Sequence, residues 1–123
     1  MNWLLVAIGG AAGSVARYGV SRLWPSAPGG RPVPTLAVNL LGSFTIGLLY
    51  IYIAARGGSP DNARLFWMTG VLGGFTTYSA FALESSLLGF SALGASYVAI
   101  TVVGCIGLAW LGRLIGTLLL AQG

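Results

Sequence analysis

The stretch GGFTTYSAF, residues 73–81, interrupts an apolar segment that runs from Leu65 to Phe90. It places two glycines, two threonines, a serine and three aromatic residues within nine positions. Glycine weakens a helix, and hydroxyl side chains compete with the helix for backbone hydrogen bonds. In a membrane, such irregular backbone is tolerated only where protein or a water-filled cavity covers it. The stretch therefore predicts a helix that is broken at its centre.

The whole chain has the composition of an integral membrane protein. Of its 123 residues, 56% are hydrophobic and 7% are charged, whereas soluble domains carry about 25% charged residues. The net charge of +4 comes from six arginines against Asp61 and Glu84. These arginines are too scattered for a basic face, so we expect membrane lipid and not nucleic acid as a partner. The length predicts a single domain over residues 1–123.

Four segments reach the roughly 20 mainly apolar residues that a membrane-spanning helix needs. They cover about 3–24, 35–55, 65–90 and 93–120. The first lacks a basic region before its apolar run, so we expect a retained helix and not a cleaved signal peptide. The short SALG link at 91–94 predicts a tight hairpin of the last two helices. The fold class is therefore an all-α integral membrane protein with four transmembrane helices, the third broken.

The arginines give almost no preference for one orientation in the membrane. Arg22 and Arg31 fall on one side, and Arg56, Arg64 and Arg113 fall on the other. Because the Lys/Arg bias of the loops normally sets orientation, such a balance permits insertion either way and an antiparallel homodimer. The alternative is that a weak bias selects one orientation.

Two helices carry polar side chains on one face. Asn39 and Ser43 are four residues apart in the second helix, and an amide NH2 group suits either an anion or an interhelix hydrogen bond. Tyr97, Thr101 and Cys105 recur at the same interval in the fourth helix. They predict either a polar track or ordinary packing, with Thr101 bonded back to its own helix.

Two charged residues lie inside the predicted spans. Arg17, late in the first span, either snorkels to the interface or forms an electropositive vestibule. Glu84 follows Phe81 by one turn, and we expect it to pair with an arginine or with backbone donors; a proton-transfer site is the alternative.

Several glycines follow the small-xxx-small spacing that lets membrane helices approach closely. Gly9 and Gly13 form one pair, and Gly112 and Gly116 form another. We expect these glycines to serve helix packing and not ligand binding.

The stretch 73–81 offers ligands for ions of both signs. Carbonyl groups freed by a break suit a small cation such as Na⁺, whereas freed N–H groups and hydroxyls suit an anion. The electropositive ring edges of Tyr78 and Phe81 can also face an anion without the charge that would trap it. A glycine kink with aromatic packing is the simpler alternative.

At these residues the sequence resembles the Fluc-type fluoride channels of the CrcB family. The resemblance rests on GGAAGSVARYG (9–19), TLAVNLLGSFTIG (35–47) and GGFTTYSAFALE (73–84), and it extends over nearly the whole chain. It implies a fluoride-selective passive channel that exports fluoride across a prokaryotic inner membrane and relieves fluoride toxicity. It also implies an antiparallel, dual-topology homodimer with two pores.

The resemblance also implies the roles of individual residues. A structural Na⁺ would be held at the dimer interface by the backbone carbonyls of Gly73 and Thr76. The residues that it assigns to the fluoride pathway are Arg17, Asn39, Thr77, Tyr78, Ser79, Phe81, Tyr97 and Thr101. The family pattern reads GGFTTFSTF, so Tyr78 and Ala80 depart from it.

Other functional classes fit the sequence less well. A small dual-topology exporter of cations or drugs needs a carboxylate in its first helix, and residues 3–24 contain none. An enzyme is not expected, because the chain has no histidine, a single cysteine and two distant acids. A packing subunit without transport activity would leave the polar centre of the third helix unexplained.

Overall fold

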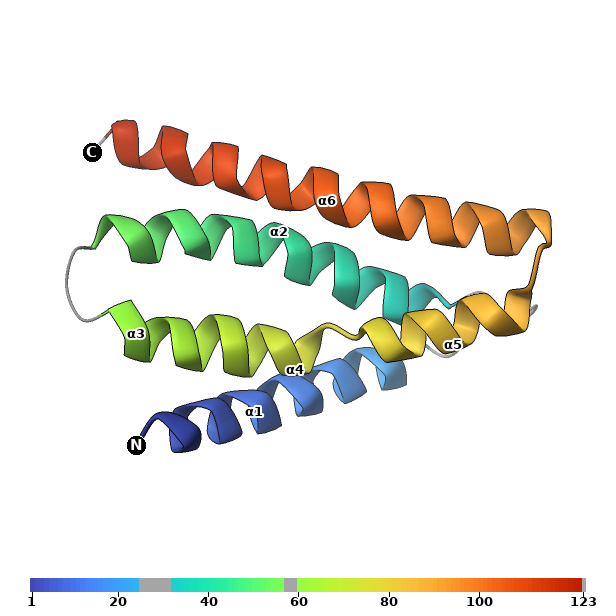
Figure 1. Ribbon diagram of the computed structural model, residues 1–123, viewed down its shortest axis with the longest axis horizontal. Coiled ribbons are helices and arrows are strands. Elements are labelled where there is room, and N and C mark those ends of the chain that lie inside the picture. Colours follow the sequence, from blue (N-terminus) through green and yellow to red (C-terminus); the bar gives the residue numbers. More distant parts are fainter. Residues whose placement is uncertain (25–31, 57–59, 123) are drawn as a thin grey trace.

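The computed structural model describes residues 1–24, 32–56 and 60–122, and these residues are almost entirely helical (Figure 1). The elements are α1 (Asn2–Leu23), α2 (Val33–Ala55), α3 (Pro60–Ala63), the π-helix η1 (Arg64–Leu72), α4 (Gly73–Phe75), α5 (Tyr78–Leu88) and α6 (Ala92–Ala121). Residues 25–31 and 57–59 of the two predicted connections, Arg31 among them, lie outside the described residues.

Three of the described helices, α1, α2 and α6, are long and apolar enough to cross a membrane. Their bounds lie within two residues of the ranges expected from the sequence. The largest difference is at the start of α2, where the helix begins at Val33 with Pro34 in its first turn. Proline fits there because the first N–H groups of a helix have no intrahelical acceptor.

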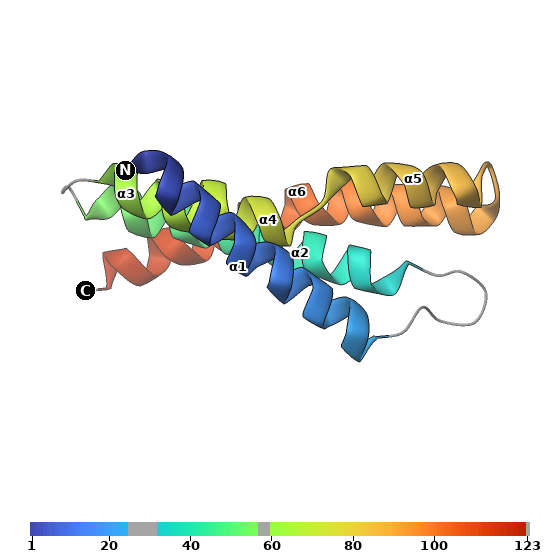
Figure 2. The same cartoon turned by 90° about the horizontal axis from the view of Figure 1, so that it is seen from below.

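The helices form two packed pairs. In Figure 1, α2 runs beside α6, and α1 packs against η1 and α4 of the third segment. Both termini lie at the same end of the molecule. At the other end, the hairpin of α5 and α6 separates from α1 and α2 (Figure 2).

Glycines set the distance between the paired helices, as the small-residue spacing predicts. A Cβ atom on Gly13 would overlap the carbonyl oxygen of Val71 in η1, and one on Gly112 would overlap that of Phe44 in α2. Since no side chain separates these backbones, the helices pack in direct contact. The predicted packing role of the glycines is confirmed.

The segment from Pro60 to Leu88 is not a continuous α-helix. It opens with one α-helical turn, continues as a π-helix over nine residues, and is interrupted by extended backbone at Thr76 and Thr77. The sequence pointed to Gly73 and Gly74 as the weak point, but both are helical. Gly74 is instead needed for packing, because a Cβ there would overlap the Gly10 carbonyl oxygen of α1.

The predicted hairpin between the last two helices is confirmed, with a link at Gly89–Ser91. Gly89 adopts a positive φ of 59°, which an L side chain rarely tolerates. Ser91 caps α6, because its hydroxyl accepts from the Gly94 N–H at 3.0 Å and donates to the Leu88 carbonyl at 2.8 Å. This link holds α5 against the first turns of α6.

Candidate functional site

Two consecutive threonines define the interruption. Thr76 has φ −81° and ψ 158°, and Thr77 has φ −150° and ψ 115°. The Thr76 N–H and hydroxyl both donate to the Leu72 carbonyl, at 3.0 and 2.9 Å. The Thr77 hydroxyl accepts from the Ala80 N–H at 3.3 Å. Thr76 therefore closes the helix before the break, and Thr77 caps the helix after it.

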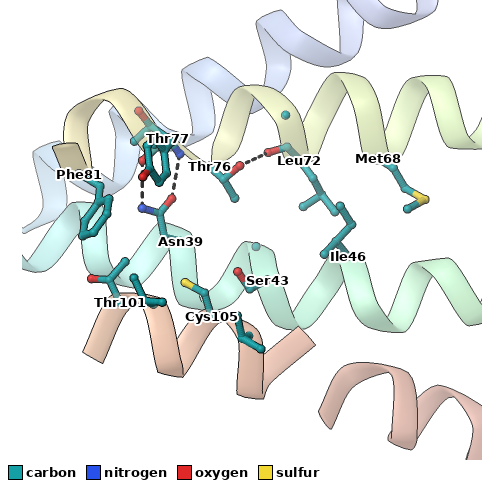
Figure 3. Close-up of a pocket in the computed structure, with 15 residues that line it drawn as sticks. Asn39, Ser43, Ile46, Met68, Leu72, Thr76, Thr77, Phe81, Thr101 and Cys105 are labelled. Atoms are coloured by element: carbon teal, nitrogen blue, oxygen red, sulfur yellow. Dashed lines mark hydrogen bonds between the residues drawn. The ribbon is translucent and has the colours of Figure 1, made fainter. Parts of the chain in front are cut away.

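Asn39 of α2 holds the break from the side. Its Oδ1 accepts from the Thr77 N–H at 2.8 Å, and its Nδ2 donates to the Thr77 carbonyl at 3.0 Å (Figure 3). The side chain is only 8% exposed. Of the two roles weighed for this amide, the structure shows the hydrogen bond between helices, and one N–H of the amide is left over.

Arg17 of α1 reaches the same region from the opposite side. Its Nε donates to the Gly74 carbonyl at 3.1 Å. The side chain also lines a cavity of about 320 Å³ together with Ser14, Thr35 and Thr77. Arg17 is therefore tied to the protein and borders this cavity.

Four carbonyl groups, those of Gly73, Gly74, Phe75 and Thr76, lose their usual donors at the break, and two of them concern the predicted cation site. In a continuous helix, the carbonyl of Gly73 would accept from the Thr77 N–H, and that of Thr76 from the Ala80 N–H. Those N–H groups bond instead to Asn39 and to the Thr77 hydroxyl. Carbonyls of unwound backbone at the end of a half-helix are suitable ligands for Na⁺.

An open cavity of about 420 Å³ lies between α2, the broken segment and α6 (Figure 3). Most residues proposed from the sequence border it, namely Asn39, Gly73, Thr76, Thr77, Tyr78, Phe81 and Thr101. Ser43 and Cys105 border it as well. The break thus brings residues of α2, α4, α5 and α6 together around one space.

Three aromatic rings follow one another, and the first two, Tyr78 and Phe81, line this cavity. Tyr78 and Phe81 meet edge to face with centroids 5.5 Å apart, and Phe81 lies 5.4 Å from Tyr97. Phe81 is 6% exposed, whereas Tyr78 is 79% exposed. Ser79 is also exposed, and its hydroxyl lies 3.4 Å from that of Thr77. The row therefore runs from the open surface into the interior.

Glu84 has different partners from those expected. Its carboxylate accepts from the Thr35 hydroxyl and from the Tyr97 hydroxyl, each at 2.7 Å. The expectation of an arginine or backbone donors is wrong, because hydroxyls on α2 and α6 take that place. Thr35 was missed in the sequence, although it precedes Asn39 by four residues on the same face of α2. The predicted back-bond of Thr101 is confirmed, since its hydroxyl donates to the Tyr97 carbonyl at 2.7 Å.

Comparison with known proteins places this chain in a family. A family model described as CrcB-like protein, Camphor Resistance (CrcB), matches residues 4–113. The chain belongs to the CrcB family. The matched range takes in the break and its partners Arg17 and Asn39.

Curated relatives are similar over two thirds or more of their length. A protein of Coxiella burnetii is 44% identical over 121 residues, which cover 94% of this chain and 98% of that one. A protein of Agrobacterium fabrum is 46% identical over 121 residues, covering 94% and 96%. A protein of Paracoccus denitrificans is 49% identical over 87 residues, covering 71% and 68%. All three are named fluoride-specific ion channel FluC.

Proposed function

We propose that this chain is a fluoride-selective passive channel that exports fluoride from the cytoplasm and so relieves fluoride toxicity. The observation that carries the proposal is the break at Thr76 and Thr77. Asn39 stabilises this break by hydrogen bonds to Thr77, and a row of aromatic rings lies beside it. Membership of the CrcB family, whose curated relatives bear the name fluoride-specific ion channel, supports it.

The N-terminal side of α5 supplies groups that suit a small anion. The first N–H groups of this helix, at Tyr78 and Ser79, have no intrahelical acceptor, and the helix dipole is positive there. The remaining amide N–H of Asn39 and the ring edges of Tyr78 and Phe81 add further weak attraction. Neutral groups of this kind replace hydration without holding the ion, as conduction requires. Tyr97 and Thr101 would border the pathway further along α6, with their hydroxyl protons donated to Glu84 and to the Tyr97 carbonyl.

The segment from α3 to α5 would act as a fourth, interrupted membrane span. Irregular backbone cannot face lipid, because unsatisfied N–H and C=O groups are costly in hydrocarbon. The cavity beside Thr76 and Thr77 is open in a single chain, and Tyr78 is 79% exposed. A second copy in antiparallel orientation would cover this face. The near balance of arginines is compatible with such a dual-topology homodimer.

The residues at the break fit a structural Na⁺ at the interface of such a dimer. Gly73 and Thr76 would hold the ion through their carbonyl oxygens, whose usual N–H donors are engaged elsewhere. When bound, the ion supplies a positive charge that offsets the carbonyl dipoles of the two half-sites. It would stay in place and would not travel with fluoride.

Export of this kind needs no energy source beyond the membrane potential. In a prokaryotic inner membrane the interior-negative potential drives an anion outward, at about 2.3 kcal/mol per charge per 100 mV. The chain carries no GK[ST] phosphate-binding signature, so nucleotide hydrolysis has no site in this sequence.

The test is fluoride efflux from proteoliposomes that contain the purified protein, followed with a fluoride electrode. Valinomycin would release potassium as the counter-ion, and chloride-loaded vesicles would serve as the matched control. We expect rapid loss of fluoride and retention of chloride. Retention of both ions by a folded, Na⁺-supplied protein would overturn the proposal, and equal loss of both would overturn selectivity.

A further inference from the structure

The carbonyl group of Gly74 has an unusual hydrogen-bond donor. In a continuous helix it would accept from the Tyr78 N–H, but the extended backbone at Thr76 and Thr77 separates the two. The Nε of Arg17 takes the place of that donor at 3.1 Å. A side chain of α1, 57 positions away in sequence, thus compensates for a bond that the break removes.

This replacement bears on the two carbonyls proposed as sodium ligands. Gly74 lies between Gly73 and Thr76 in the chain, and re-forming the helix would satisfy the carbonyls of Gly73 and Gly74 together. A carbonyl that is shielded from water and has no donor favours re-forming the helix, because leaving a buried carbonyl without a hydrogen bond costs free energy. By bonding Gly74, Arg17 removes one of the unsatisfied carbonyls that would favour closing of the helix.

The charge of Arg17 cannot be the property that helps a cation bind. A guanidinium group close to a cation site repels the cation, so its electrostatic effect on Na⁺ affinity is unfavourable. What Arg17 offers is the donor at Nε, held on a helix that packs directly against η1 and α4. Asn39 provides the equivalent support from α2 by bonding both backbone groups of Thr77.

We propose that Arg17 is a positioning residue for the sodium site, acting through the hydrogen bond from its Nε to Gly74 and not through its charge. This inference rests on the proposed sodium site of the channel. Without the bond, the break closes in part of the population, and Na⁺ must then bind a less populated conformation. The apparent Na⁺ affinity falls by the populated fraction.

Two substitutions of nearly equal length separate the bond from the charge. Glutamine places its Nε2 donor at the chain position of the arginine Nε and carries no charge. Methionine has the same length but no donor. Arg22, an exposed arginine in the last turn of α1, provides the control pair Arg22→Gln and Arg22→Met.

The experiment is the thermal unfolding midpoint of purified protein in detergent, measured against Na⁺ concentration with choline keeping ionic strength constant. Binding of Na⁺ to the folded state raises the midpoint, so the titration reports Na⁺ affinity without any flux measurement. We expect Arg17→Gln to titrate like the wild type, and Arg17→Met to need about tenfold more Na⁺. Both Arg22 variants should titrate like the wild type.

Three results would overturn the inference. Equal titrations of Arg17→Gln and Arg17→Met would show that the donor is not decisive. A uniform loss of stability at every Na⁺ concentration would show a general packing role. A wild-type protein that ignores Na⁺ would remove the sodium site itself, while fluoride efflux would still decide whether the protein is a channel. If Arg17→Met does not fold, Arg17→Lys replaces it, because lysine moves the donor one atom further along.

Discussion

Asn39 bonds to both backbone polar groups of Thr77, accepting from its N–H at 2.8 Å and donating to its carbonyl at 3.0 Å. A side-chain amide thus occupies the place that a neighbouring strand or the next helical turn would take. The bonds join α2 to the only part of the segment 60–88 whose backbone is not helical. The geometry of the break therefore depends on a residue outside it.

We expect Asn39→Asp to lower fluoride flux by about tenfold or more. Aspartate can still accept from the Thr77 N–H, but it loses the donor to the Thr77 carbonyl and adds a negative charge on the anion pathway. The loss of the hydrogen bond to the Thr77 carbonyl, and the repulsion between that carbonyl and the new carboxylate, should also reduce the free energy of unfolding by about 1–3 kcal/mol. Efflux from proteoliposomes and thermal unfolding measure the two effects. Ser43→Ala, one turn further along α2 and beside the same cavity, is the control that should retain flux.

Phe81→Ile should abolish or strongly reduce fluoride flux while the protein remains folded and keeps the oligomeric state of the wild type. Isoleucine fills much of the buried volume, but it lacks the electropositive ring edge that we propose for the pathway. Size-exclusion chromatography would follow assembly, and proteoliposome efflux would follow function. Leu83→Ile on the exposed face of α5 is the matched change. Normal flux through Phe81→Ile would remove the ring-edge mechanism.

Tyr78→Phe should retain fluoride flux within about twofold, because the contact between its ring and Phe81 uses the ring and not the hydroxyl. Tyr78→Ile should reduce flux as Phe81→Ile does. The comparison assigns the effect of this position to its ring edge or to its hydroxyl. A large loss in Tyr78→Phe would show that the hydroxyl, which the family pattern lacks, takes part in this chain.

Glu84→Ala should destabilise the protein more than Glu84→Gln. The carboxylate accepts from Thr35 and Tyr97, and its removal leaves both hydroxyls without their acceptor. Hydrogen bonds to a charged group contribute about 1.5–3 kcal/mol each, so we expect a loss of about 3 kcal/mol for alanine and less for glutamine. Unfolding in graded denaturing detergent would compare both with Ser86→Ala, an exposed serine on the same helix. Equal stability of the alanine and glutamine variants would contradict a role in joining α2, α5 and α6.

Added arginines confined to one end of the molecule should fix a single orientation and suppress fluoride resistance. The end that carries Arg56 and Arg64 is suitable, since both side chains are exposed there. An oppositely biased copy in the same cells should restore resistance, because the two would form the antiparallel pair. Cysteine labelling from either side of the membrane would verify the orientation. Full activity of a single-orientation population would refute the antiparallel dimer.

Much of the fold could be predicted from the sequence because the membrane imposes simple length rules. Apolar length and prolines located α1, α2 and α6 within two residues. The spacing of Gly9 and Gly13 indicated close helix contacts, and these occur against η1. Helix bounds depend on residues that are neighbours in the sequence, and close helix contacts depend on the regular spacing of small residues. Both can be seen directly in a single sequence.

The remaining features depend on contacts between distant parts of the chain. Gly74 looked like the weak point of the third helix, but its missing side chain serves a contact with α1. The break lies at Thr76 and Thr77, where partners from other helices satisfy the backbone. Glu84 finds Thr35 at a separation of 49 residues, which no local pattern indicates. The hydrogen-bond partners of the break are therefore the part of this site that cannot be predicted from the sequence and is seen only in the structure.

Arg17 and Asn39, which hold the break from outside, both precede it in the chain by more than 30 positions. In a protein made from its N-terminus, α1 and α2 are complete before Thr76 is added. The side chains that satisfy Gly74 and Thr77 are therefore already present in the chain when the break is added. The main packing partner of α2 is α6, which is made last, so the support from Asn39 becomes fixed only when α6 is added.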